Sequence, residues 1–67
     1  MNKYQRGERV IIECDNGTVS DNSLALITNY YRTLDVNGNF TYEYELIVEK
    51  DSILCYFPES SLSRVKN

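Results

Sequence analysis

The sequence has no histidine, no tryptophan, one proline and only two cysteines among its 67 residues. Without histidine, no side chain has an unperturbed pKa near neutral pH, so the commonest general base of enzymes is missing. No Ser–Lys or Cys–His arrangement for nucleophilic catalysis can be drawn. The three glycines, Gly7, Gly17 and Gly38, are too scattered to form a phosphate-binding loop. The sequence therefore predicts a protein that is not an enzyme and holds no cofactor.

A metal site is not expected either. With no histidine and no Cys-x-x-Cys motif, a zinc ion would need two carboxylates or ligands from a second chain. Cys14 and Cys55 are too few for a disulfide framework. Both lie in apolar, strand-like runs, which predicts buried, reduced thiols. A bridge between the two cysteines is an alternative that the sequence leaves open.

Long apolar runs are absent as well. No stretch approaches the roughly 18 consecutive apolar residues of a membrane span. Residues 1–6 lead into no apolar core of the kind that a secretion signal has. The hydrophobic fraction of 42% and the net charge of -3 are typical of a folded chain. We expect one soluble, cytoplasmic domain over residues 1–67, with no membrane partner.

The chain also has few basic residues, with seven Lys and Arg against ten Asp and Glu. Nucleic-acid binding needs a basic stripe on the surface, whereas these cations are scattered along the chain. Arg6, Arg9 and Arg64 could cluster if the first and last strands pair. Nucleic acid is therefore not the expected partner.

The clearest structural signal is alternation over residues 40–49. One face of this segment carries apolar side chains, namely Phe40, Tyr42, Tyr44, Leu46 and Val48. The other face carries polar side chains, namely Thr41, Glu43, Glu45 and Glu49, interrupted only by Ile47. Because side chains alternate across a pleated strand, the pattern predicts a strand whose apolar set faces the core.

Four further strands are expected, over residues 7–14, 24–33, 53–57 and 62–65, and helical periodicity is nearly absent. Asn37-Gly38 predicts a tight hairpin turn with two residues at positive φ. Residues 15–17 and 50–52 are expected to form turns, and residues 18–23 a polar loop. Both parities of residues 24–33 carry apolar side chains, so their inward face stays open. Pro58 should end the fourth strand, and residues 59–61 then form one 3₁₀ turn.

This order of elements closes most economically as a five-stranded barrel in which the last strand pairs with the first. Three segments are similar to motifs of known barrels. Residues 7–10 match a Gly-Asp/Glu-x-Val opening, residues 25–27 stand where Gly-x-Val is common, and residues 56–62 match an apolar-Pro-x-x-x-apolar pattern. The layout resembles the SH3-like small barrels of the KOW and Tudor-like class. The resemblance implies an all-β, five-stranded SH3-like barrel with a single 3₁₀ turn before the last strand.

The resemblance does not imply a function, because a fold alone does not specify one. SH3 domains that grip proline-rich ligands use a tryptophan and an Ala-Leu-Tyr-Asp-Tyr signature, and this chain has neither. The tyrosine that such domains place after the 3₁₀ turn would fall at Ser61. Polyproline binding is therefore not expected.

The chain is rich in tyrosine, with six residues. Tyr42 and Tyr44 have the inward parity and should fill the core, whereas Tyr30, Tyr31 and Tyr56 cannot all fit inside. Exposed tyrosines beside carboxylates favour protein partners, because tyrosine gives a large contact area at small entropic cost. An aromatic cage for a cation, as Tudor-like barrels have, is an alternative.

We therefore expect a non-enzymatic protein-binding module whose partner has a basic surface. The residues expected to contact that partner are Glu43, Glu45, Ile47, Glu49, Tyr30, Tyr31 and Tyr56. Small acidic chains of this kind resemble phage or mobile-element products, among which inhibitors that occupy the surface of a host or defence protein are frequent. The alternative is a nucleic-acid-associated accessory barrel or a small subunit of a larger complex.

Overall fold

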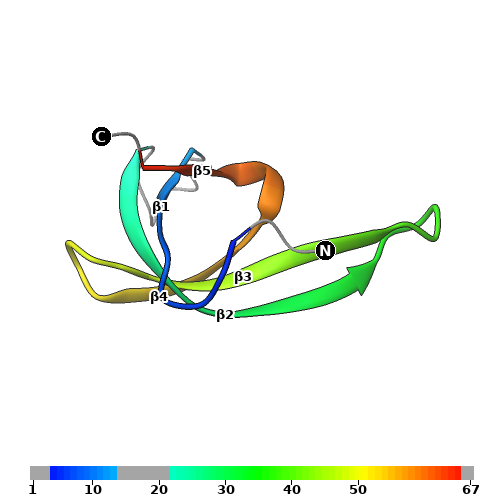
Figure 1. The fold of residues 1–67 in the computed structure, drawn as a ribbon, viewed down its shortest axis with the longest axis horizontal. Helices are drawn as coiled ribbons and strands as arrows, with labels where there is room; N and C mark the ends of the chain where they lie inside the picture. The colour runs from blue at the N-terminus through cyan, green and yellow to red at the C-terminus, as the bar shows by residue number, and fades with distance from the viewer. Residues whose placement is uncertain (1–3, 14–21, 66–67) are drawn as a thin grey trace.

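A computed structural model describes residues 4–13 and 22–65 of the chain. It contains the elements β1 (Arg9–Ile12), β2 (Ser23–Leu34), β3 (Phe40–Val48), β4 (Ile53–Pro58), the 3₁₀ turn η1 (Glu59–Ser61) and β5 (Leu62–Arg64). The five strands form one antiparallel sheet in the order β4-β3-β2-β1-β5 (Figure 1). The predicted all-β class, the single 3₁₀ turn and the pairing of the last strand with the first are confirmed.

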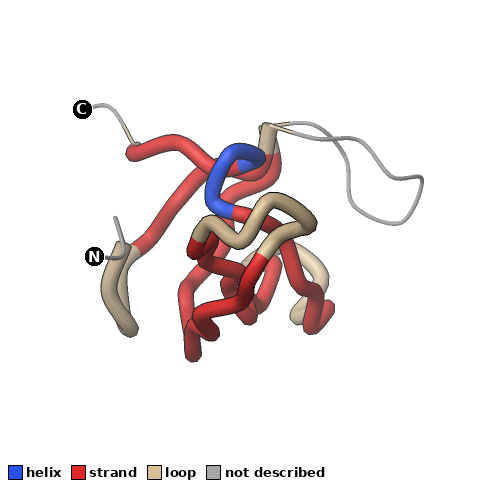
Figure 2. Tube along the Cα trace, turned by 90° about the vertical axis from the view of Figure 1, so that its right-hand side faces the viewer, coloured by secondary structure: helices blue, strands red, loops and turns tan. Residues whose placement is uncertain are grey.

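The sheet is strongly curved but does not close. Both views show the curvature, with η1 (blue in Figure 2) joining β4 to β5. Among the described residues, β4 and β5 are the two edges of the sheet and do not pair with each other. The closed barrel therefore stays a prediction. The first strand is shorter than predicted, and Cys14, the predicted turn at 15–17 and most of the loop 18–23 lie outside the described residues.

A β-bulge in β2 explains why both parities of this strand carry apolar residues. Ile27 pairs with Leu46 and Asn29 pairs with Glu45, so Thr28 is an extra residue opposite β3. Such an insertion shifts the alternation by one residue and bends the strand. Before the bulge the inward residues have odd numbers, as in the buried Ile27, and after it they have even numbers, as in the partly buried Tyr30.

The core lies on the concave side of the sheet. Its buried side chains are Tyr4, Val10, Ile12, Ala25, Ile27, Tyr44, Leu46, Val48, Phe57 and Leu62. The predicted inward face of β3 is confirmed for Tyr44, Leu46 and Val48, and Tyr42 packs against the core while partly exposed.

The predicted burial of Phe40 is wrong, because 61% of this residue is exposed. The last residue pair between β3 and β4 is Glu43 with Pro58, whereas β2 and β3 continue together to Leu34 and Phe40. The two strands therefore run out as a ribbon beyond the rest of the sheet (Figure 1). The guanidinium carbon of Arg32 lies 4.3 Å from the centre of the Phe40 ring and covers one of its faces.

The tip of this ribbon corrects the predicted two-residue turn. Gly38 has positive φ (81°), but Asn37 does not. The N–H of Gly38 donates to the Asp35 carbonyl (3.1 Å), and the N–H of Asp35 donates to the Asn39 carbonyl (2.9 Å). The Asp35 carboxylate also accepts from the N–H groups of Asn37 and Asn39. The loop is thus a turn capped by Asp35 and followed by a glycine bulge, which is the common longer hairpin connection.

Tyr4 is a core residue that the sequence pattern does not reveal. It is fully buried, and its hydroxyl donates to the Leu62 carbonyl (3.1 Å). Its N–H donates to the Tyr44 hydroxyl (3.2 Å), and the two rings meet edge to face with centres 5.5 Å apart. The segment before β1 is therefore packed against β3 and β5 by a side chain that stands alone in a polar stretch.

Cys55 is half-buried rather than buried, and it packs against the core as a free thiol. Burial raises the pKa of this thiol, which lowers its thiolate fraction at neutral pH. In a Cys14→Ser variant, we expect Cys55 to react with a thiol reagent severalfold more slowly in the folded protein than in urea. Stopped-flow labelling at pH 7.5 measures both rates, and equal rates would show that the fold does not shield this thiol.

Candidate protein-binding surface

The convex side of β2, β3 and β4, here called the outer face, brings together residues from three strands. Directly opposed residues in an antiparallel sheet project on the same side. The register places Leu26, Ile47 and Leu54 in one cross-strand row and Glu45 beside Tyr56 in the next. A third row contains Tyr31, Glu43 and Pro58. Because Leu46 and Val48 point into the core, Ile47 and Glu45 point away from it.

The outer face has exposed apolar and aromatic residues on β2 and β4, the two strands that flank β3. Leu54 and Tyr56 on β4 are 53% and 55% exposed, and Tyr31 on β2 is 45% exposed. Leu26 is 37% exposed, and Ile47 is half-buried between Leu26 and Leu54. The apolar row is therefore open to solvent and borders the tyrosines and carboxylates.

The structure gathers most of the predicted contact residues on this face. Glu43, Glu45 and Ile47 lie on β3, and Glu49 follows directly after it; Tyr31 and Tyr56 flank them from the neighbouring strands. Tyr30 does not join them. It lies on the concave side, partly buried, with its ring centre 6.1 Å from that of Tyr44.

Sequence reasoning missed Leu26 and Leu54. In β4 the buried Phe57 shows that odd-numbered residues face the core. Leu54 is even-numbered and so faces outward, which the alternation of residues 53–57 could have shown. Leu26 was hidden by the bulge at Thr28, because the apolar residues before and after the bulge have opposite parities.

Hydrogen bonds hold Glu45 and Tyr56 in place. The Tyr56 hydroxyl donates to Oε2 of Glu45 (2.9 Å), and the Thr28 hydroxyl donates to Oε1 (2.7 Å). The bond to this carboxylate stabilises the neutral phenol and raises the pKa of Tyr56. Glu43, in contrast, is exposed and makes no side-chain hydrogen bond or ion pair with the described residues.

Glu49 forms a bidentate pair with Arg9. The guanidinium Nε and Nη2 atoms lie 2.7 and 3.0 Å from the two carboxylate oxygens. The hydrogen bonds lower the pKa of Glu49 and raise that of Arg9, since each favours the charged form. The charge of Glu49 is thus compensated locally, and the net negative charge of the outer face comes from Glu43 and Glu45.

Removing the partner of Glu49 should change its titration. Because the folded-state pKa of Glu49 is depressed, the pair stabilises the fold above the ordinary glutamate pKa, and this contribution is lost as the pH falls through the depressed value. We expect Arg9→Gln to move the Glu49 midpoint upward. Carbon-detected NMR of the side-chain carboxyls between pH 2 and 7 measures it; an unchanged midpoint would mean that the pair does not persist in solution.

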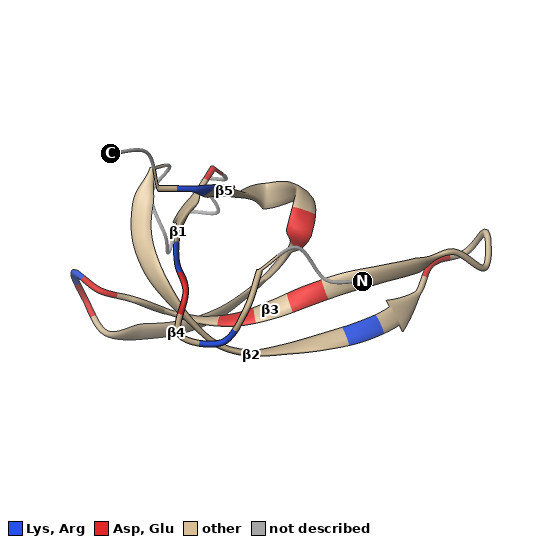
Figure 3. Cartoon of the chain, in the orientation of Figure 1, with Lys and Arg blue, Asp and Glu red and all other residues tan. Residues whose placement is uncertain are grey.

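Arg6, Arg9 and Arg64 each contact a different polar or acidic residue in the described part of the chain. Although β1 and β5 pair, Nη1 of Arg64 lies 2.7 Å from Oε2 of Glu8, and Arg6 donates to the Asn29 side chain (3.2 Å). Arg64 lies opposite Val10, which is buried, so the two side chains are on the same side of the sheet. Arg9 precedes Val10 on β1 and therefore points to the other side. Figure 3 shows basic and acidic residues interspersed on this part of the molecule and acidic residues along β3.

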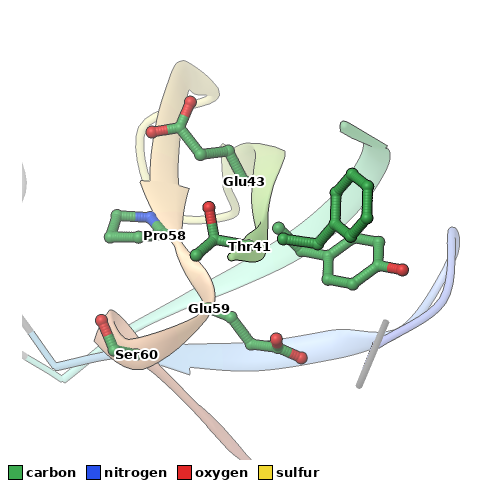
Figure 4. Close-up of a pocket in the computed structure, with 7 residues that line it drawn as sticks. Thr41, Glu43, Pro58, Glu59 and Ser60 are labelled. Atoms are coloured by element: carbon green, nitrogen blue, oxygen red, sulfur yellow. The ribbon is translucent and has the colours of Figure 1, made fainter. Parts of the chain in front are cut away.

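An open pocket of about 560 Å³ adjoins the outer face at the end of β4. Its lining comes from the start of β3 and from the turn into η1, namely Phe40, Thr41, Tyr42, Glu43, Pro58, Glu59 and Ser60. Figure 4 shows Glu43 and Glu59 on opposite sides of Thr41.

Within residues 4–13 and 22–65, no three potential metal-ligating side chains come together. The same residues contain no helix long and apolar enough to cross a membrane. Comparison of the chain with family models, with curated proteins and with solved structures finds no match.

Proposed function

We propose that this protein is a non-enzymatic protein-binding module whose outer face docks on a basic protein surface. The observation that carries the proposal is the exposed row of Leu26, Ile47 and Leu54 next to Tyr31 and Tyr56, on the face that also holds Glu43 and Glu45. Exposed apolar and aromatic residues that lie together on one face are a common feature of protein interfaces.

The contacts on this face support a specific role for each group. Leu54 and the tyrosines offer apolar area that a partner can remove from water. Tyr56 is already oriented by Glu45, so little side-chain entropy would be lost on binding. Glu43 has no intramolecular partner among the described residues, which leaves its charge available to steer a basic protein toward the face.

The proposal extends to the biological setting and to the fold. A small domain that works by covering a partner's surface fits an inhibitor of a host or defence protein made by a phage or mobile element. The strand order and the 3₁₀ turn before β5 support membership of the SH3-like barrel class. The free thiol of Cys55 supports a reducing, cytoplasmic location.

Two pairs of matched variants test the docking face. We expect Leu54→Asp to abolish capture of the partner in a pull-down from native cells, and Val36→Asp, the same change at an exposed apolar residue of the hairpin tip, to leave it intact. We expect Glu43→Lys to slow association with the purified partner, and Asp51→Lys, in the β3–β4 turn, to have a smaller effect.

Surface plasmon resonance at increasing salt completes this test. The association rate with the unmodified protein should fall as salt screens the steering charges. Circular dichroism confirms that each variant is folded. Equal binding of folded Leu54→Asp and Val36→Asp proteins would rule out the outer face as the docking surface.

A further inference from the structure

The edge of β3 that faces β4 has no strand partner at residues 40–42 within residues 4–13 and 22–65. On its other side β3 pairs with β2 as far as Leu34 and Phe40, but β4 stops pairing at Glu43 and Pro58. There the chain turns away into η1. Beyond the Glu43–Pro58 pair, no described β4 residue is paired with residues 40–42. An exposed strand edge of this kind is a template for another extended chain.

The open pocket described above lies along this edge. Its lining includes the side chains of Phe40 and Tyr42 on β3, and of Pro58 opposite them. These groups provide apolar contacts for side chains of an incoming strand, while Thr41 lies between the two carboxylates of the pocket (Figure 4). The pocket thus combines a backbone template with apolar and polar walls, the two components of peptide recognition by strand addition.

The charge of the pocket indicates what kind of peptide fits. Glu43 and Glu59 line it, and no lysine or arginine is among its described lining residues. The Glu59 carboxylate accepts a hydrogen bond from the Tyr44 hydroxyl (3.3 Å), which orients it at the start of η1. Arg32 stacked on Phe40 shows that the ring face of this residue accommodates a guanidinium group.

We propose that an extended peptide segment bearing lysine or arginine side chains adds to residues 40–42 as a short strand that continues the line of β4. Its backbone bonds to the free edge of β3, and its cationic side chains reach Glu43 and Glu59. This site is distinct from the apolar row of the outer face, and it shares Glu43 and Pro58 with the third row of that face.

The test uses a synthetic heptapeptide of alternating lysine and threonine or valine residues, with blocked ends, titrated into the ¹⁵N-labelled full chain. We expect NMR shift changes concentrated at residues 40–43 and 58–60, and slower amide exchange within residues 40–42. N-methylation of the central peptide bonds should weaken binding about tenfold or more, because it removes strand hydrogen bonds. Replacing the lysines with glutamate should abolish binding.

Protein variants separate charge recognition from general effects. Glu43→Gln combined with Glu59→Gln should weaken peptide binding roughly threefold to tenfold, whereas Asp51→Asn should not change it. Leu54→Asp, which tests the outer face, should bind the peptide normally, so the two proposals fail separately. Shift changes away from the pocket, equal binding of the N-methylated peptide, or equal binding of the glutamate peptide would overturn strand addition at this edge.

Discussion

Replacing Leu46 with alanine is expected to lower the free energy of unfolding by about 2–5 kcal/mol. Leu46 is fully buried in the centre of β3, opposite Ile27 on β2 and Cys55 on β4. The substitution removes apolar contacts on both sides and leaves a cavity that the surrounding strands can fill only in part. A domain of this size has a total stability of roughly 3–10 kcal/mol, so this single change removes a large share of it.

Leu54→Ala is the matched control for Leu46→Ala. The two leucines lie on adjacent strands and lose the same atoms, but Leu54 is 53% exposed on the outer face. We expect its substitution to cost less than about 1 kcal/mol. Urea titrations followed by circular dichroism give both values. Equal losses in the two variants would contradict the assignment of opposite faces.

Tyr4→Ala is expected to cost about 3–5 kcal/mol, comparable to the loss of any large aromatic core residue. Its fully buried ring packs against Tyr44, and its hydroxyl donates to Leu62 at the start of β5. Removing the side chain takes away contacts between the segment before β1, β3 and β5 at once.

Tyr4→Phe separates the two contributions of Tyr4. It keeps the ring and removes only the hydrogen bond to Leu62, so the expected loss is about 1–3 kcal/mol, including the carbonyl left without its partner. Thermal and urea unfolding of both variants measure the two losses, and that of Tyr4→Ala should be the larger. A Tyr4→Ala protein as stable as the unmodified chain would show that the segment before β1 is not part of the folded core.

Local patterns were sufficient to predict the strands and the face of β3. Alternation over residues 40–48 depends only on the pleat, and Pro58 and the polar residues after it mark the 3₁₀ turn directly. Patterns in the sequence could not show along what length each strand is covered by neighbouring strands. Phe40 has the correct parity but lies beyond the end of β4, and Tyr4 becomes buried only because β3 and β5 surround it.

The part of the candidate site that lies on β3 could be predicted from the sequence. Glu43, Glu45 and Ile47 share a face for the same reason of parity, and Tyr56 follows from the meander. The bulge at Thr28 could not be read from the sequence, because it depends on the register between β2 and β3. It moved Tyr30 to the concave side and placed Leu26 on the outer face.

Photo-crosslinking tests the docking of the outer face most directly. A benzophenone amino acid replaces Tyr56 on the outer face in one protein and Asp51 in the β3–β4 turn in another, and each is irradiated in native cells. We predict one strong adduct from position 56, with a basic protein, that disappears on competition with unmodified protein but persists with the Leu54→Asp variant as competitor. An adduct from position 51 of equal yield, or equal competition by Leu54→Asp, would contradict the outer face as the protein-binding surface.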